Sequence, residues 1–209
     1  MKGNCLIAQS GGPTAAINAT LAGVYSGAKK FSQIETIYGG LNGIEGIMKE
    51  KLVDLSPILD KGNNLELLKN TPSSFLGSCR YKLKGFDVAE DEYKRIFEVF
   101  EKFNIKYFFY IGGNDSMDTV LRLKQYQAEK NMGVTVIGVP KTIDNDLYEV
   151  DHTPGFGSAA KYIATTIKEI AADTAVYDMD SIVVAEVMGR NAGWLTLSAG
   201  LARDSKGRC

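Results

Sequence analysis

Two stretches of this sequence repeat one arrangement, in which a short apolar run is followed by two adjacent glycines and then by a segment with helical periodicity. The first apolar run covers residues 5–9 and leads into Ser-Gly-Gly at residues 10–12. The second covers residues 106–111 and leads into Gly-Gly at residues 112–113. A strand, a glycine turn and a helix make the first half of a βαβ unit. We therefore predict an α/β fold of three layers, with a mainly parallel sheet between helices.

A third apolar run, residues 134–139, is interpreted as a buried strand that ends at Pro140, because proline cannot donate to a sheet ladder. Polar residues follow at once: Lys141, Thr142, Asp144, Asn145 and Asp146. Ligands of parallel α/β sheets bind at the carboxyl ends of the strands. One carboxylate of this loop can take a proton from a hydroxyl, and another can face a magnesium ion. The alternative is an acidic turn closed by side-chain caps.

The glycine turns allow two interpretations. Backbone N–H groups without a neighbouring Cβ can approach an anion at a helix N-terminus, or the glycines only close a tight turn. Asn114 and Asp115 follow the second turn as ligand candidates, or one of them is an N-cap. A dinucleotide fingerprint is poorly supported, since the G-x-G-x-x-G spacing is absent.

The remaining elements are predicted from periodicity and turn residues. A first domain is expected over residues 1–140, and residues 141–209 are interpreted as the start of a second, incomplete domain. We predict a short strand at residues 35–38, and helices at 44–51, 64–69, 91–103 and 158–174. A strand at residues 180–186 and a helix at 191–203 complete the prediction. Arg80 and Arg190 are candidates for anion binding, and Arg80 is equally interpretable as a surface arginine.

Composition excludes several classes of protein. The net charge is −1 and the pI about 5.9, which gives no sign of a nucleic-acid or anionic-membrane partner. No apolar run approaches the roughly 18 residues that a membrane-spanning helix needs. The three cysteines form no C-x-x-C pair, so we expect a reducing, cytoplasmic location without disulfides. The single histidine, His152, argues against a Ser-His-Asp triad.

Five segments together resemble the phosphofructokinase family, in its pyrophosphate-dependent type. They occur in the family's order and extend over essentially the whole chain. The segments at 140–146 and 186–190 are specific, whereas the glycine turns alone are not. The matching segments are residues 10–12 with Asn18-Ala19, residues 76–80, residues 112–116, Pro140-Lys141-Thr142-Ile143-Asp144-Asn145-Asp146 and Glu186-Val187-Met188-Gly189-Arg190.

The resemblance implies a role for each matching residue. Asp144 is expected to act as the general base on the C1 hydroxyl of fructose 6-phosphate, and Lys141 to assist catalysis. Asp144 is also expected to bind the sugar substrate, and the sugar phosphate and the transferring phosphoryl group are assigned to Thr142, Met188, Gly189 and Arg190. The phosphoryl donor is assigned to Gly12, Arg80, Asp115 and Ser116, and the Mg²⁺ cofactor to Asn114 and Asp146.

Two positions favour pyrophosphate over ATP as the donor. Family members with an acid at the position of Asp115 and a lysine at that of Lys141 use pyrophosphate. A carboxylate where the ATP α-phosphate would lie repels that phosphate, and a nearby lysine supports the charge on the phosphate leaving group. The implied reaction forms fructose 1,6-bisphosphate and is expected to be reversible, as a step of glycolysis.

Three positions depart from the family pattern. Asn114 stands where most relatives have a magnesium-binding aspartate, which gives Asp146 more weight. Ala22 and Ser26 replace arginines that bind an allosteric effector in ATP-dependent bacterial members, so such regulation is not implied. Ser181 replaces an arginine that reaches the neighbouring subunit's sugar phosphate.

The complete enzyme is expected to be a homodimer or homotetramer, and this chain to be a fragment with little activity. The fragment interpretation arises because a helix at residues 191–203 should lead into a further strand, and none follows. The alternatives are an ATP-dependent 6-phosphofructokinase and a non-catalytic protein that binds phosphate or sugar phosphate. A lipid or NAD kinase is disfavoured by residues 140–146 and 188–190.

Overall fold

The computed structural model describes residues 1–203 of the chain. It divides into two compact units, and the division falls between Lys141 and Thr142. Unit 1 extends from Met1 to Lys141, and unit 2 starts at Thr142. Among the described residues, no helix combines the length and the apolar character that crossing a membrane requires.

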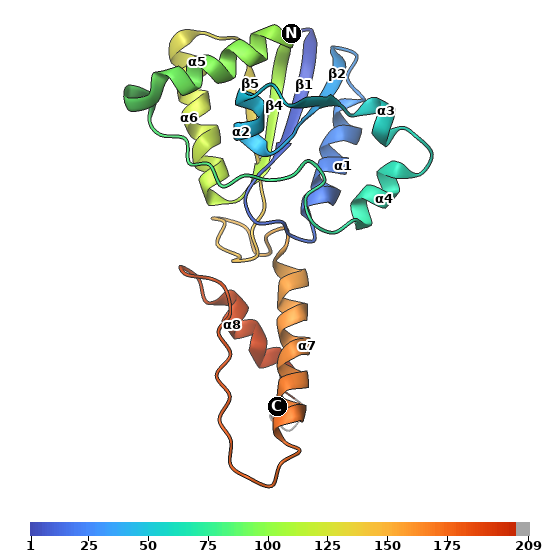
Figure 1. Cartoon of the computed structure of the whole chain (residues 1–209), viewed down its shortest axis with the longest axis vertical. Coiled ribbons are helices and arrows are strands. Elements are labelled where there is room, and N and C mark those ends of the chain that lie inside the picture. The colour runs from blue at the N-terminus through green and yellow to red at the C-terminus, as the bar shows by residue number, and fades with distance from the viewer. Residues whose placement is uncertain (204–209) are drawn as a thin grey trace. The chain divides into compact units, whose positions relative to one another are not determined.

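Unit 1 is built on a five-stranded sheet with the strand order β3-β2-β1-β4-β5 (Figure 1). The pairs β1·β2, β1·β4 and β4·β5 are parallel, and only the edge strand β3 is antiparallel to its neighbour. The predicted mainly parallel sheet is therefore confirmed. The strands are β1 (Gly3–Gln9), β2 (Ile34–Gly40), β3 (Leu52–Asp54), β4 (Ile105–Gly112) and β5 (Thr135–Pro140).

Helices cover both faces of the sheet, because side chains of a strand alternate between its faces. Leu6 and Ala8 of β1 pack into one apolar cluster with α2 (Gly43–Met48), α5 (Phe86–Lys102) and α6 (Asn114–Lys130). Cys5 and Ile7 pack into the other cluster. That cluster includes α1 (Ile17–Ala28), α3 (Ser56–Leu59) and α4 (Asn64–Asn70). The three predicted layers are thus present in unit 1 (Figure 1).

One side of the helix α6 is buried against the sheet, and the opposite side is exposed. Leu123 is fully buried in the cluster under the sheet, whereas Leu121 on the same helix is 54% exposed. Two residues apart on a helix point about 200° apart, so only one of the two leucines can face the core.

Replacing Leu123 with alanine is expected to lower the free energy of unfolding by about 2–5 kcal/mol, through lost burial and the cavity that remains. The matched variant Leu121→Ala is expected to change it by less than about 0.5 kcal/mol. Urea unfolding followed by circular dichroism measures both. Equal losses for the two variants would contradict this packing of α6.

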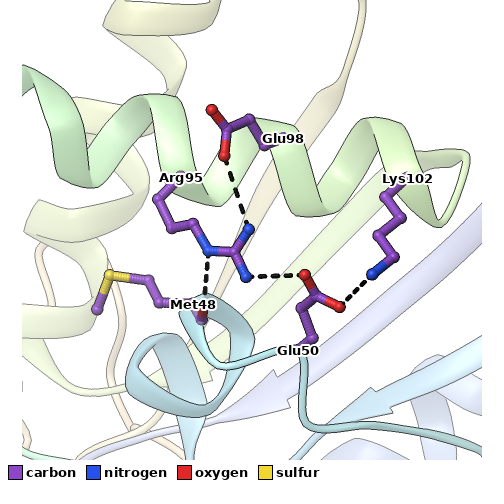
Figure 2. A network of polar contacts seen from close by, with 5 residues as sticks. All are labelled: Met48, Glu50, Arg95, Glu98 and Lys102. Carbon is purple, nitrogen blue, oxygen red and sulfur yellow. Dashed lines mark hydrogen bonds and ion pairs between the residues drawn. The ribbon is translucent and has the colours of Figure 1, made fainter.

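A group of charged side chains fastens α5 to the turn after α2 (Figure 2). Arg95 donates from Nε to the carbonyl of Met48 (2.9 Å) and from Nη2 to Glu50 (2.8 Å). Lys102 donates to the second carboxylate oxygen of Glu50 at 2.5 Å. Glu98 lies 3.6 Å from Nη1 of Arg95. The hydrogen bonds from Lys102 and then Arg95 lower the pKa of Glu50.

Because the pKa of Glu50 is lower in the folded protein, its ionised form stabilises the fold above the unfolded pKa near 4.3. That contribution is lost as the pH falls through the folded pKa. Glu50→Gln should therefore reduce the urea midpoint at pH 7, and the difference from the wild type should vanish in acid. Glu98→Gln, at a more exposed and more distant carboxylate, is the control and should change the midpoint less. A pH-independent difference for Glu50→Gln would argue against the ionic origin.

Unit 2 contains α7 (Phe156–Thr174), α8 (Trp194–Ser198) and a 3-10 turn at Ala199–Ala202. Two sequence predictions fail here. The strand predicted at residues 180–186 does not form: the segment lies in no sheet, and Ile182 and Val184 are 92% and 89% exposed. An extended segment needs a neighbouring strand to satisfy its N–H and C=O groups, and none pairs with it within residues 1–203. The helix predicted at residues 191–203 is reduced to α8 and the 3-10 turn.

Candidate active site

The carboxyl ends of β1, β4 and β5 lie together at one edge of the sheet in unit 1, because these strands are adjacent and parallel. The turns after β1 and β4 touch there. The hydroxyl groups of Ser10 and Ser116 are 2.7 Å apart and both side chains are buried. The N–H of Ser10 also donates to the carbonyl of Ile111 in β4 (2.9 Å). The predicted donor residue Ser116 thus lies against the first glycine turn.

Lys141 follows β5 and is the most unusual residue of this edge. Its N–H donates to the carbonyl of Gly112 (2.9 Å), and its ammonium group donates to the carbonyl of Gly12 (2.5 Å). The residue is only 3% exposed, and burial lowers the pKa of its side chain. No carboxylate within residues 1–203 forms an ion pair with it. The ammonium group is therefore bonded to a backbone carbonyl and has no ion-pair partner in the described part of the chain.

The glycines around this cation serve two purposes. Gly11 has a φ of +77°, and a Cβ there would lie 3.3 Å from Nζ of Lys141. A Cβ on Gly112 would approach the hydroxyl oxygen of Ser116 to 2.1 Å. These two positions need glycine for the fold itself. By contrast, a Cβ on Gly12 would meet no atom within 4 Å, so Gly12 borders open space.

Residues 76–80 lie against the first turn. Ser78 donates from its hydroxyl to the carbonyl of Gly11 (2.5 Å), and the N–H of Gly11 donates to the carbonyl of Cys79 (3.1 Å). Arg80 comes next in the chain and its side chain is exposed. Sequence reasoning selected Arg80 and missed Ser78 and Ser10. The available signal was that Ser78 stands in the same short motif as Arg80, and Ser10 in the same turn as Gly12.

Asn114 and Asp115 form the first turn of α6, and both are exposed. The N-cap position belongs to Gly113, so neither residue has the capping role that was the alternative interpretation. The carboxylate of Asp115 is placed near the positive end of the helix dipole, where a negative charge is stabilised. It thus puts a negative charge beside the second glycine turn.

The acidic loop begins at Thr142 and lies in unit 2. Asn145 organises it: the residue is buried, with φ +57°, and its amide donates to the carbonyl of Asp151 (3.0 Å). The Asn145 side-chain oxygen accepts the N–H of Thr153 (2.8 Å), and the Thr153 hydroxyl donates to the carbonyl of Thr142 (2.8 Å). These bonds hold the loop in a fixed shape.

Asp144 and Asp146 flank Asn145 and are half-buried. The N–H of Asp144 donates to the hydroxyl oxygen of Thr142 (3.1 Å), which brings these two predicted substrate residues together. Among the described residues, no group of three or more acidic, histidine or cysteine side chains is arranged as a metal site. Mg²⁺ is commonly bound through one or two carboxylates together with substrate phosphates, and the carboxylate of Asp146 and the amide oxygen of Asn114 are ligands of the type it prefers.

The segment of residues 188–190 is more exposed than residues 142–147 of the acidic loop. Gly189 has a φ of +116°, and a Cβ there would lie 2.7 Å from the carbonyl oxygen of Ala192, so the bend requires glycine. Met188 is 69% exposed, and Arg190 is also exposed. Within residues 142–203, no hydrogen bond or ion pair joins these three residues to the acidic loop. The predicted sugar-phosphate residues are therefore not assembled by hydrogen bonds in unit 2.

A cavity of about 480 Å³ lies between α7 and residues 177–185, and it is lined mainly by apolar side chains. It includes none of the predicted site residues. A second cavity of about 210 Å³ in unit 1 borders Ser78 and Cys79, with Lys49 and Lys51 in its lining.

Glycine turns around a buried cation, at the carboxyl ends of parallel strands, define an α/β protein with the features of an anion-binding site. Comparison with known proteins identifies the family. The phosphofructokinase family model matches residues 4–207, and the chain belongs to the phosphofructokinase family.

Several known proteins are similar to this chain in sequence and fold over about half of their own length. It is 44% identical to the pyrophosphate–fructose 6-phosphate 1-phosphotransferase of Methylococcus capsulatus, over 97% of this chain and 49% of that protein. Identity to the Xanthomonas campestris protein of the same name is 45%, over 96% of this chain and 47% of the relative. The crystal structure of the pyrophosphate-dependent phosphofructokinase from Nitrosospira multiformis matches with a TM-score of 0.88 and 44% identity, over 98% of this chain and 51% of that one. The chain thus spans about half the length of the curated relatives it matches.

The buried charge of Lys141 has a measurable consequence for stability. Because its pKa is lower in the folded state than in the unfolded state, the unfolded chain binds more protons between the two pKa values. Stability should therefore rise with pH across that window, up to about 10.4. As the pH is raised, the free energy of unfolding measured in urea should increase more for the wild type than for Lys141→Met. Lys124→Met, at an exposed lysine, serves as the control. If stability depends on pH in the same way for both variants, burial does not lower the pKa of Lys141.

Proposed function

We propose that this chain provides the pyrophosphate-binding part, and some of the sugar-phosphate site, of an enzyme that phosphorylates fructose 6-phosphate at C1. The donor is pyrophosphate, and the products are fructose 1,6-bisphosphate and phosphate. The observation that carries the proposal is the buried ammonium group of Lys141, bonded to the carbonyl of Gly12 and not ion-paired within residues 1–203. Burying a cation without a counter-charge costs free energy of folding. A bound polyanion would supply that counter-charge.

The surroundings of Lys141 support a short, highly charged donor. Open space at Gly12 leaves room for phosphate oxygens next to backbone groups. The exposed carboxylate of Asp115 at the next turn disfavours the additional α-phosphate of a nucleotide. The names of the relatives, which specify pyrophosphate, agree with this assignment.

The proposed chemistry assigns each acid and base a step. Asp144 takes the proton of the C1 hydroxyl, whose oxygen then forms a bond to a phosphorus atom of pyrophosphate. The bond from that phosphorus to the bridging oxygen breaks, and Lys141 stabilises the phosphate that leaves. Thr142, Met188, Gly189 and Arg190 are proposed to hold the sugar phosphate, and Arg80 and Ser116 the donor. Mg²⁺, held by Asp146 and Asn114 together with phosphate oxygens, would neutralise part of the donor's charge.

Further properties are proposed for the complete enzyme. We expect a homodimer or homotetramer that acts in the cytoplasm, in glycolysis, without a nucleic-acid or membrane partner. The buried free thiols of Cys5 and Cys79 suit a reducing compartment. Because the relatives are about twice as long, residues 1–209 alone are expected to bind the donor and to turn over little substrate.

Donor binding can be tested on the chain itself. Titration calorimetry with Mg²⁺ should detect pyrophosphate binding to the wild type and much weaker binding of ATP. The double variant Asp115→Gly, Lys141→Gly should lose pyrophosphate affinity and gain ATP affinity. ATP binding that equals pyrophosphate binding in the wild type would favour the alternative, an ATP-dependent 6-phosphofructokinase.

The proposed catalysis can be tested in a chain of the relatives' full length. A chimera of this chain with the second half of the Methylococcus capsulatus relative should form fructose 1,6-bisphosphate in a coupled assay. Asp144→Asn in the chimera should reduce kcat by about 10²–10⁴-fold and leave pyrophosphate affinity unchanged. A folded chimera that binds pyrophosphate without turnover would favour the other alternative, a non-catalytic phosphate-binding protein.

A further inference from the structure

Gln9 is the last residue of β1 and is fully buried, on the face of the sheet that α1 covers. Its side chain makes four hydrogen bonds. The amide nitrogen donates to the carbonyl of Ile17 (3.1 Å) and to the side-chain oxygen of Asn18 (3.0 Å). The amide oxygen accepts from the hydroxyl of Ser74 (2.9 Å) and from the N–H of Leu76 (2.9 Å). All the polar capacity of the amide is therefore used within the fold.

The orientation of this amide is determined by its backbone partners. The N–H of Leu76 can only donate and the carbonyl of Ile17 can only accept. A reversed amide would oppose donor to donor and acceptor to acceptor in a buried place, which is costly. Gln9 therefore fixes the distance between residues 74–76 and the start of α1.

Asn18 extends the same network. It is buried in the first turn of α1, and its side-chain oxygen also accepts from the N–H of Phe75 (2.9 Å). Its amide nitrogen donates to the carbonyl of Thr71 (2.9 Å). The two amides together join the end of β1, the beginning of α1 and residues 71–76.

Residues 71–80 are thus fastened at two places. Gln9 and Asn18 hold the first part, and the bonds of Gly11 to Ser78 and Cys79 hold the second part against the glycine turn. Gln9 is also the residue directly before that turn. All the polar atoms of its side chain are already bonded within the fold, so Gln9 has none left to bind a ligand directly.

We propose that Gln9 is a positioning residue of the pyrophosphate site. It sets the spacing between the glycine turn at residues 10–12 and the segment that carries Ser78 and Arg80, so that both meet the same anion. This inference rests on the proposed function, because it names the residue that shapes the proposed donor site. A preorganised site binds more tightly because its parts need no ordering when the ligand arrives.

The test compares two amides at opposite ends of one strand. Asn4, near the start of β1, also links segments: its amide nitrogen donates to the carbonyl of Phe103 (2.7 Å) and its oxygen accepts from the N–H of Thr36 (3.0 Å). Gln9→Met and Asn4→Leu each replace an amide with an apolar side chain of similar length. Both should lower the urea midpoint, but only Gln9→Met should raise the Kd for pyrophosphate, by about tenfold or more.

Ser74→Ala is a second, milder variant for the case that Gln9→Met does not fold. It removes only one hydroxyl of the network, from a partly buried loop residue. It should weaken pyrophosphate binding more than Asn4→Leu does. Wild-type affinity in folded Gln9→Met and Ser74→Ala would overturn the positioning role, and so would equal weakening by Asn4→Leu. If the wild type itself does not bind pyrophosphate, the proposed function fails, and this inference with it.

Discussion

The parallel pairing of β1 with β2 on one side and with β4 on the other is the constraint from which the rest of unit 1 follows. A strand between two parallel neighbours is covered on both faces, so its residues must be apolar in both directions. Cys5 and Ile7 face one helical layer, and Leu6 and Ala8 face the other. Parallel pairing also brings the ends of neighbouring strands to the same edge, which is why segments a hundred residues apart meet around Lys141.

The edge combines rigid packing with an unfavourable charge. The hydroxyl pair of Ser10 and Ser116 and the backbone bonds of Gly11 and Gly112 hold two turns in place. Lys141 is held between them, although burial disfavours its protonated form. For the proposed polyanion, fold stability and affinity are opposed at this residue: the desolvation that disfavours the charge of Lys141 would also strengthen its attraction for the anion.

The sequence predicted most of this arrangement, because strands, glycine turns and helices are encoded locally. Apolar runs located β1, β4 and β5, and the glycine pairs located the turns that meet at the edge. The failures have physical causes. Residues 180–186 have the composition of a strand, but a strand forms only with a partner, and its own residues cannot supply one. Gln9 was taken as the end of an apolar run, since the partners of its amide lie up to 67 residues away. The roles of the predicted site residues remain proposals.

The glycines at this edge are constrained in two different ways. Gly11 and Gly112 are required by backbone conformation or by a neighbouring atom, so their replacement disturbs the fold before any ligand is involved. Gly12 is under no such requirement within the described chain. Selection for glycine at position 12 would then act through what binds beside it. A side chain at position 12 would therefore change what can bind beside the turn and leave the scaffold itself in place.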